Sequence, residues 1–174
     1  MSGVKIYIAK NDELGPDIVW QRATGKKLLI DGVRVWLGDD KFTLDIKTAE
    51  NGKPYLVNSD LYFNISHSRR YVVCAISEEA VGIDIQFHKK GNTDATAKRI
   101  MSTEEWQEYT LACDKDKYFF DLWAKKESYL KYTGDGITVD MRLLDIDAYV
   151  QEILVDKEYS CMLCTGSECE YVIK

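Results

Sequence analysis

Alternating apolar and polar positions predict strands along the first half of the chain. Segments with this two-residue period lie at residues 4–8, 42–46, 61–66 and 81–87. A turn is predicted at Gly52 and Pro54, between the second and third of these strands. Residues 71–76 (YVVCAI) are apolar throughout, which predicts a central strand covered on both faces.

Helical periodicity is concentrated in three other segments. Helices are predicted at residues 16–30, 102–112 and 115–132. Pro16 suits a first helical position, Ser102 and Glu105 form a capping box, and Gly134 ends the third helix. Residues 141–174 are predicted to form three or four short strands. This order of elements indicates an α+β protein made of two halves of similar size.

Chain length and charge narrow the class of protein. The 174 residues suit one large domain or two small halves that share a core. The net charge is −6, and residues 140–174 hold eight acidic against three basic side chains. Because the chain has no basic stripe, we expect no nucleic-acid partner. It also has no apolar run of about 18 residues, so we expect no membrane span.

The cysteines and the first residues bear on location. The chain begins without an apolar signal region, and its five cysteines are an odd number, so we predict a cytoplasmic protein. Cys161, Cys164 and Cys169 could ligate a metal, but three thiols are one short of a closed zinc site. If residues 159–164 are a strand, Cys161 and Cys164 point to opposite faces, which favours ordinary packing.

A carboxylate interrupts the apolar face of the long predicted helix. At about 100° per residue, Phe120, Trp123 and Leu130 share one face, and Glu127 falls on it, with Lys131 one turn further along. A buried carboxylate costs several kcal/mol unless a cation meets it. The pattern indicates either a cation site or an ordinary helix pair of Glu127 with Lys131.

A second carboxylate lies within the strand predicted at residues 81–87. Gly82, Asp84 and Gln86 share the face opposite to the apolar positions, and Gly82 leaves room there for a close neighbour. Two carboxylates brought together repel unless a cation lies between them. Oxygen ligands, few in number, suit Mg²⁺ together with phosphate oxygens. The alternative is that Asp84 caps a turn.

Residues 64–68 (NISHS) end a predicted strand with two hydroxyls and a histidine, followed by Arg69 and Arg70. Hydroxyls, imidazolium and backbone N–H groups are typical of a phosphate site. A histidine at a strand end can equally be a surface or packing residue, so this motif gains weight from the other two.

Four motifs in this order, GKPYL, FNISHS, VGIDIQ and LWAKKESYLKYTGDGI, closely resemble the 4′-phosphopantetheinyl transferases of the Sfp type. The resemblance covers residues 52–137, half of the chain. It implies an enzyme that transfers the phosphopantetheine of coenzyme A to a serine of an acyl or peptidyl carrier protein and releases 3′,5′-ADP. It also implies an α+β fold of two similar halves, residues 1–80 and 81–174, related by a pseudo-twofold. The active site would lie in the cleft between them.

The resemblance also implies roles for individual residues. Asp84, Glu127 and Gln86 would hold Mg²⁺. Glu127, or a metal-bound water beside it, would take the serine proton, and Lys131 would neutralise the diphosphate and the departing 3′,5′-ADP. His67 would be a further catalytic residue. Coenzyme A would be bound by Lys53, Pro54, Ser66, His67 and Lys131, with Arg22 and Lys26 on its 3′-phosphate.

Two departures from the family pattern leave an alternative open. Many members carry an acid at the position of Gln86. The N-terminal region of this chain is also shorter than that of the bacterial Sfp-type enzymes. The alternative is a carrier-protein-binding module with weakened catalysis. A different Mg²⁺-dependent phosphoryl transferase is disfavoured because no Gly-rich nucleotide loop is present. Two halves in one chain favour a monomer.

Overall fold

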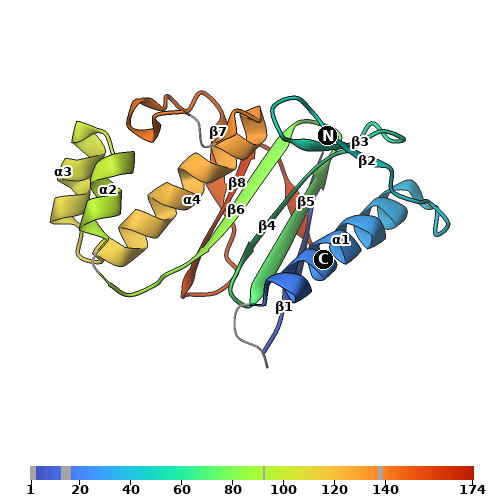
Figure 1. Ribbon diagram of the computed structural model, residues 1–174, viewed down its shortest axis with the longest axis horizontal. Helices are drawn as coiled ribbons and strands as arrows, with labels where there is room; N and C mark the ends of the chain where they lie inside the picture. Colours follow the sequence, from blue (N-terminus) through green and yellow to red (C-terminus); the bar gives the residue numbers. More distant parts are fainter. Residues whose placement is uncertain (1–2, 13–16, 92, 137–138) are drawn as a thin grey trace.

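The computed structural model describes residues 3–12, 17–91, 93–136 and 139–174, and it combines helices with sheets, which confirms the α+β prediction (Figure 1). The first half contains β1 (Val4–Lys10), α1 (Ile18–Leu37), β2 (Ile46–Thr48), β3 (Pro54–Leu56), β4 (Tyr62–Ser68) and β5 (Tyr71–Ser77). The second contains β6 (Val81–Phe87), α2 (Asp94–Ile100), α3 (Thr103–Leu111), α4 (Lys115–Thr133), the short 3₁₀ helix η2 (Met141–Leu143), β7 (Tyr149–Glu152), β8 (Tyr159–Thr165) and β9 (Tyr171–Ile173).

The first sheet has the strand order β4-β5-β1-β9, with β5 antiparallel to both of its neighbours. All seven residues of β5 are buried, so the predicted central strand is confirmed. The predicted boundary between residues 80 and 81 falls between β5 and β6. However, β9 returns from the end of the chain to pair in parallel with β1, Val4 opposite Tyr171. The two-half division and its pseudo-twofold stay predictions.

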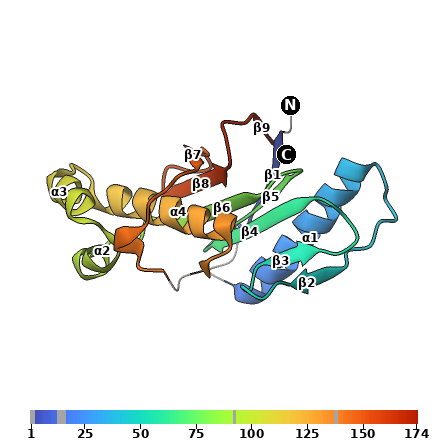
Figure 2. The ribbon, with the colours of Figure 1, turned by 90° about the horizontal axis from the view of Figure 1, so that it is seen from above.

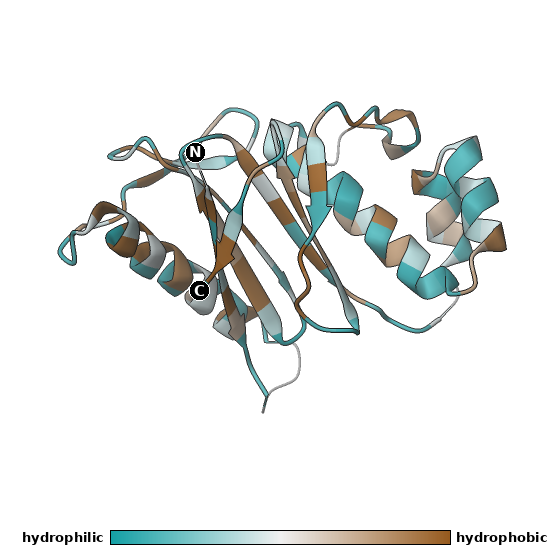
Figure 3. Ribbon diagram, turned by 180° about the vertical axis from the view of Figure 1, so that it is seen from behind, coloured by the Kyte–Doolittle hydropathy of each residue, from teal (hydrophilic) through white to brown (hydrophobic). Residues whose placement is uncertain are grey.

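The second sheet, β6-β8-β7, is antiparallel and carries α4 on one face. Seen from above, α1 and α4 lie on the same side of the strands, and β7 and β9 lie toward the opposite side (Figure 2). The inner faces of the two sheets share one core, to which β1, β5, β6 and β8 contribute. From behind, the strands show long hydrophobic stretches, whereas α2 and α3 are mostly hydrophilic (Figure 3).

The two sheets meet at β4 and β6 through side chains rather than a backbone ladder. Three β4 side-chain oxygens each accept a backbone N–H from β6: Asn64 Oδ1 from Ile83 at 3.0 Å, Ser66 Oγ from Ile85 at 3.3 Å, and Ser68 Oγ from Phe87 at 3.0 Å. Because both partners advance by two residues, the two strands run parallel at this seam. The seam satisfies buried N–H groups that an open sheet edge would leave unpaired.

Several local predictions are confirmed. The capping box of Ser102 and Glu105 is present at α3, and Gly134 ends α4 with a φ of 85°. The region after η2 holds three short strands, as predicted. A separate finding concerns membranes: the helices within the described residues include none that combines the length and the apolar character of a membrane span.

Other local predictions are wrong. The strand predicted at residues 42–46 is not formed, because Phe42 and Leu44 pack singly against the core beneath α1 while the strand begins only at Ile46. The first helix continues to Leu37, since Gly32 and Val33 continue its buried face past the predicted end at residue 30. Pro16 lies outside the described residues. The sequence pattern missed α2 altogether.

Candidate functional site

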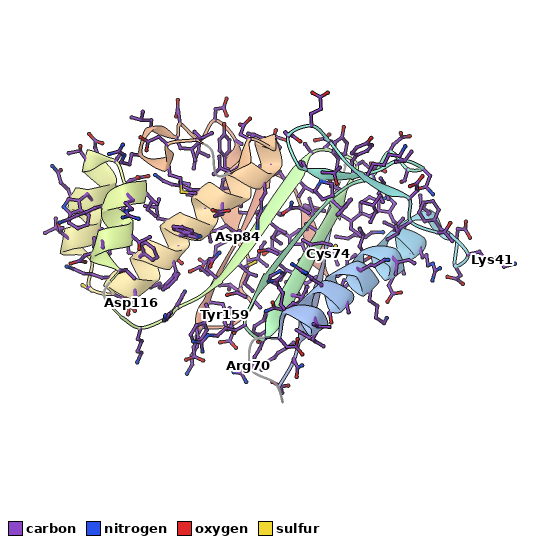
Figure 4. The ribbon with its side chains drawn as sticks, viewed as in Figure 1. Lys41, Arg70, Cys74, Asp84, Asp116 and Tyr159 are labelled. Carbon is purple, nitrogen blue, oxygen red and sulfur yellow. The ribbon has the colours of Figure 1, made fainter. Side chains whose placement is uncertain are left out.

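Asp84 and Glu127, predicted to act together, line one cavity of about 700 Å³. Asp84 lies on β6 and faces α4, on the opposite side of the strand from the shared core (Figure 4). A Cβ at Gly82 would lie 2.0 Å from the carbonyl oxygen of Ser128, so the missing side chain is what lets α4 approach β6 so closely. This confirms that Gly82 makes room for a close neighbour.

The buried Asp84 carboxylate is held by three side chains. Oδ1 accepts from Lys131 Nζ at 2.6 Å and from Ser66 Oγ at 2.8 Å. Oδ2 accepts from Gln86 Nε2 at 2.8 Å. Lys131 also donates to Ser66 Oγ at 3.0 Å, so the ammonium, hydroxyl and carboxylate form a closed triangle between β4, β6 and α4.

Glu127 is less well satisfied than Asp84. Its side chain is buried, and its Oε1 has no hydrogen-bond partner among the described residues. Burial raises the pKa of Glu127, the negative charge of Asp84 raises it further, and Lys131 opposes both effects. A buried carboxylate oxygen without a partner costs free energy, which is expected where a cation belongs. The cavity that Glu127 lines has room for such a cation.

His67 follows Ser66 on β4 and also lines the cavity. Desolvation lowers its pKa most, and the charges of Lys131 and Arg22 lower it further. The ring is therefore neutral near pH 7, in a position where a phosphate would favour protonation. Arg22 is exposed on α1, and its positive charge acts on His67. Lys26, one turn further along α1, is also exposed.

The structure brings six of the predicted site residues to this cavity: Ser66, His67, Asp84, Gln86, Glu127 and Lys131. Arg22 and Lys26 lie outside its lining. Lys53 and Pro54 line a second cavity of about 670 Å³, and Lys53 Nζ donates to the carbonyl oxygen of Tyr132 at 2.8 Å. Whether Lys53 and Pro54 contact a coenzyme stays a prediction.

The sequence did not predict the rest of the cavity lining as one group. These further lining residues include Lys89, Lys90, Thr93, Thr96, Phe119, Phe120 and Trp123. The helical period had placed Phe120 and Trp123 on the face of Glu127, and that placement is confirmed. The residues before and within α2 carry no periodic signal, so they were missed.

Lys126 is a second residue that sequence reasoning missed. Its side chain is 1% exposed and its Nζ donates to the carbonyl oxygens of Ile100 and Met141 and to Glu105 Oε2, at 2.8, 2.7 and 2.6 Å. It ties α2, α3 and the segment at η2 to α4. Because these partners are remote in sequence, no local pattern pointed to them.

The donor set of the cavity fits a hard cation. Two carboxylates and an amide oxygen are ligands that Mg²⁺ accepts when water and phosphate complete its shell. Within the described ranges no group of three or more His, Cys, Asp and Glu side chains is placed to hold a metal. All five cysteines are free, and Cys161 and Cys164 are buried on opposite faces of β8, as ordinary packing predicts.

Comparison with known proteins decides the family. A family model described as the 4′-phosphopantetheinyl transferase superfamily matches residues 80–170, which include Asp84, Glu127 and Lys131. The chain belongs to this superfamily. The match covers the part of the chain that carries both carboxylates, whereas Ser66 and His67 precede it.

Individual members of the superfamily are similar over a longer stretch. A 4′-phosphopantetheinyl transferase of Bacillus subtilis is 36% identical over 136 residues, covering 74% of this chain and 60% of that protein. The transferase Sfp of Bacillus subtilis strain 168 is 37% identical over 134 residues, covering 72% and 59%. The transferase psf-1 of Bacillus pumilus is 32% identical over 172 residues, covering 80% and 73%. The chain thus spans about 60% of the length of the first two relatives.

Proposed function

We propose that this chain transfers the 4′-phosphopantetheine of coenzyme A to a serine hydroxyl of an acyl or peptidyl carrier protein. The observation that carries the proposal is the buried Oε1 of Glu127, which finds no hydrogen-bond partner in the part of the chain that the structure describes and lies with Asp84 and Lys131 in one cavity. Membership of the superfamily and the names of the relatives support the same reaction.

Asp84 and Glu127 are the residues that would hold Mg²⁺, with Gln86 as a third ligand through its amide oxygen or through a water. The amide nitrogen of Gln86 donates to Oδ2 of Asp84, and the amide oxygen would serve as a ligand if the amide turned over. When bound, Mg²⁺ supplies positive charge to the diphosphate of the coenzyme. Two observations support this assignment. Oε1 of Glu127 has no hydrogen-bond partner among the described residues, and the proposed ligand atoms are all oxygens.

The transfer breaks one phosphorus–oxygen bond and forms another. The serine oxygen bonds to the phosphorus that carries the pantetheine arm, and the bond from this phosphorus to 3′,5′-ADP breaks. The electron pair of that bond leaves with 3′,5′-ADP. Glu127, or a water beside it, would take the serine proton. The Lys131 ammonium neutralises charge on the departing phosphate.

Coenzyme A would lie across the seam between β4 and β6. Arg22 and Lys26, one turn apart on α1, would contact its 3′-phosphate, and His67, whose pKa is lowered in part by the charge of Arg22, would meet a phosphate beside them. The hydroxyl of Ser66 already donates to Asp84 and accepts from Ile85 and Lys131. We therefore assign Ser66 mainly to fixing Asp84 and Lys131 beneath the coenzyme, and His67 to direct contact with a phosphate.

We further propose that the chain acts in the cytoplasm as a monomer. Five free cysteines fit a reducing compartment, and residues from both sheets line the cavity without help from a second copy. Analytical ultracentrifugation at working concentration tests the monomer.

The test is incubation with coenzyme A, Mg²⁺ and an apo carrier protein, followed by the intact mass of the carrier. The proposal predicts the gain of one phosphopantetheine on one serine and the appearance of 3′,5′-ADP. An unchanged mass with carriers from fatty-acid, polyketide and peptide synthesis would contradict it. Tight carrier binding without any change in mass would support the alternative, a binding module with lost catalysis.

A further inference from the structure

The turn at residues 50–54, which carries Lys53, packs against the end of α4. Lys53 Nζ donates to the carbonyl oxygen of Tyr132 at 2.8 Å, across 79 positions of sequence. The last carbonyl groups of a helix have no partner within the helix, and a cation there also matches the helix dipole. Lys53 therefore caps α4 from the other half of the chain.

A second contact supports the same junction. Gly134, which ends α4, has a φ of 85°, and a Cβ there would lie 2.5 Å from Nδ2 of Asn51 and 3.4 Å from Cδ of Lys53. The turn can lie this close to the helix end because residue 134 has no side chain. Asn51 and Lys53 thus meet the same helix end from one turn.

The opposite side of this helix end is held by β6. A Cβ at Gly82 would lie 2.5 Å from the backbone nitrogen of Tyr132, so strand and helix are in direct backbone contact there. The last turn of α4 is therefore clamped between β6 and the turn at residues 50–54. Lys131, in this clamped turn, is the residue whose ammonium reaches Asp84 at 2.6 Å.

The Lys53 amine is directed to this helix end rather than to the site cavity. The cavity that Lys53 lines shares no lining residue with the cavity of Asp84 and Glu127. From this place Lys53 can act on the site through α4.

We propose that Lys53 is a positioning residue, which fixes the last turn of α4 and thereby holds the Lys131 ammonium against Asp84. Its kinetic consequence rests on the proposed transferase activity, whereas its structural consequence does not. The proposal separates Lys53 from residues that touch the coenzyme, and the two roles give opposite kinetic signatures.

The kinetic test compares Lys53→Met and Lys53→Arg with Lys47→Met, a matched control at an exposed lysine of β2 in the same hairpin. Lys53→Met should lower kcat about fivefold or more and leave KM for coenzyme A within about twofold. Lys53→Arg, which can still donate to a carbonyl, should restore most of kcat, and Lys47→Met should match the wild type. A tenfold rise in KM with kcat unchanged would assign Lys53 to the coenzyme and overturn the proposal.

The structural test is hydrogen–deuterium exchange at the backbone amides of residues 131–134, without coenzyme. Exchange should be about tenfold faster in Lys53→Met than in the wild type and in Lys47→Met. Equal exchange in all three proteins would overturn the proposal. If the wild type transfers nothing, the proposed function fails and exchange alone decides the role of Lys53. Lys53→Ala, which also removes the donor, replaces Lys53→Met in both tests if the methionine variant does not fold.

Discussion

The ammonium of Lys131 lies 2.6 Å from Oδ1 of Asp84 and joins the last turn of α4 to the middle of β6. The Asp84 side chain is almost fully buried, whereas that of Lys131 keeps about a quarter of its exposure. Asp84 thus already has a cationic partner, whereas Oε1 of Glu127 has no hydrogen-bond partner among the described residues. This difference gives the two carboxylates different expected behaviour on substitution.

Asp84→Asn should destabilise the protein, because it leaves Lys131 without its charged partner. We expect a loss of about 2 kcal/mol in the free energy of unfolding, below the value for a fully buried pair because water reaches Lys131. The measurement is urea denaturation, with Asp140→Asn as control. Asp140 pairs with Arg142 at the same 2.6 Å but at the surface, so its loss should change the free energy of unfolding far less. Equal effects at both positions would contradict this account.

Gln86→Glu should make the stability of the protein more dependent on bound Mg²⁺ and should tighten the binding of that ion. Without metal, a carboxylate in place of the Gln86 amide would face Oδ2 of Asp84, so the melting temperature in EDTA should fall. With Mg²⁺ the added charge should lower the concentration needed for half-maximal transfer several-fold. Thermal unfolding and rate are measured over a Mg²⁺ series. No shift in the Mg²⁺ requirement would mean that residue 86 does not contact the ion.

Coenzyme binding should tighten as the pH falls toward 6.5, through His67. The pKa of His67 is lowered in the free protein, so the ring is neutral at pH 7, and a bound phosphate should raise that pKa again. Binding then takes up a proton, and affinity rises by at most about tenfold per pH unit. Calorimetry in buffers of different ionisation enthalpy measures this uptake.

Two variants control for the other titrating groups. His67→Gln should remove the proton uptake. His88→Gln should keep it, since His88 contacts Ser160 and lies outside the lining of the site cavity. Equal uptake in the wild type and His67→Gln would show that this histidine does not meet the phosphate.

Gly82→Ala should be among the most damaging small substitutions. Its Cβ would lie 2.0 Å from the carbonyl oxygen of Ser128. Because both sides of this contact are backbone, β6 and α4 would have to move apart to relieve the clash. We expect a loss of about 3 kcal/mol or more in the free energy of unfolding. Gly3→Ala is the control, because its Cβ would lie 3.5 Å from the nearest atom, the carbonyl oxygen of Glu170. A Gly82→Ala protein as stable as Gly3→Ala would show that β6 and α4 are not so close.

The convergence of Asp84 and Glu127 could be predicted because each lies in an element with a clear period. Alternation fixed the face of Asp84, and the helical repeat fixed the face of Glu127. Carboxylates on two such faces suggested a cation between them, and the family resemblance implied that both hold it. The pairing of Lys131 with Asp84 was not predicted, because it depends on how closely the helix lies on the strand.

Other features depend on contacts that no local pattern encodes. β9 has three residues, and nothing in them indicates that they pair with β1 rather than with β7 or β8. The burial of Lys126 depends on carbonyl groups of Ile100 and Met141 that meet only in the folded chain. The position of Lys53 was inferred from a resemblance, which carries a residue's likeness but not its contacts.

Metal binding tests the central proposition most directly, namely that Asp84 and Glu127 hold one divalent ion beside the coenzyme. Electron paramagnetic resonance of Mn²⁺, with coenzyme A present, counts the bound ions and gives their affinity. We predict one ion per chain in the wild type, and at least about a hundredfold weaker binding in Glu127→Gln and in Asp84→Asn. Unchanged stoichiometry and affinity in both folded variants would contradict the account.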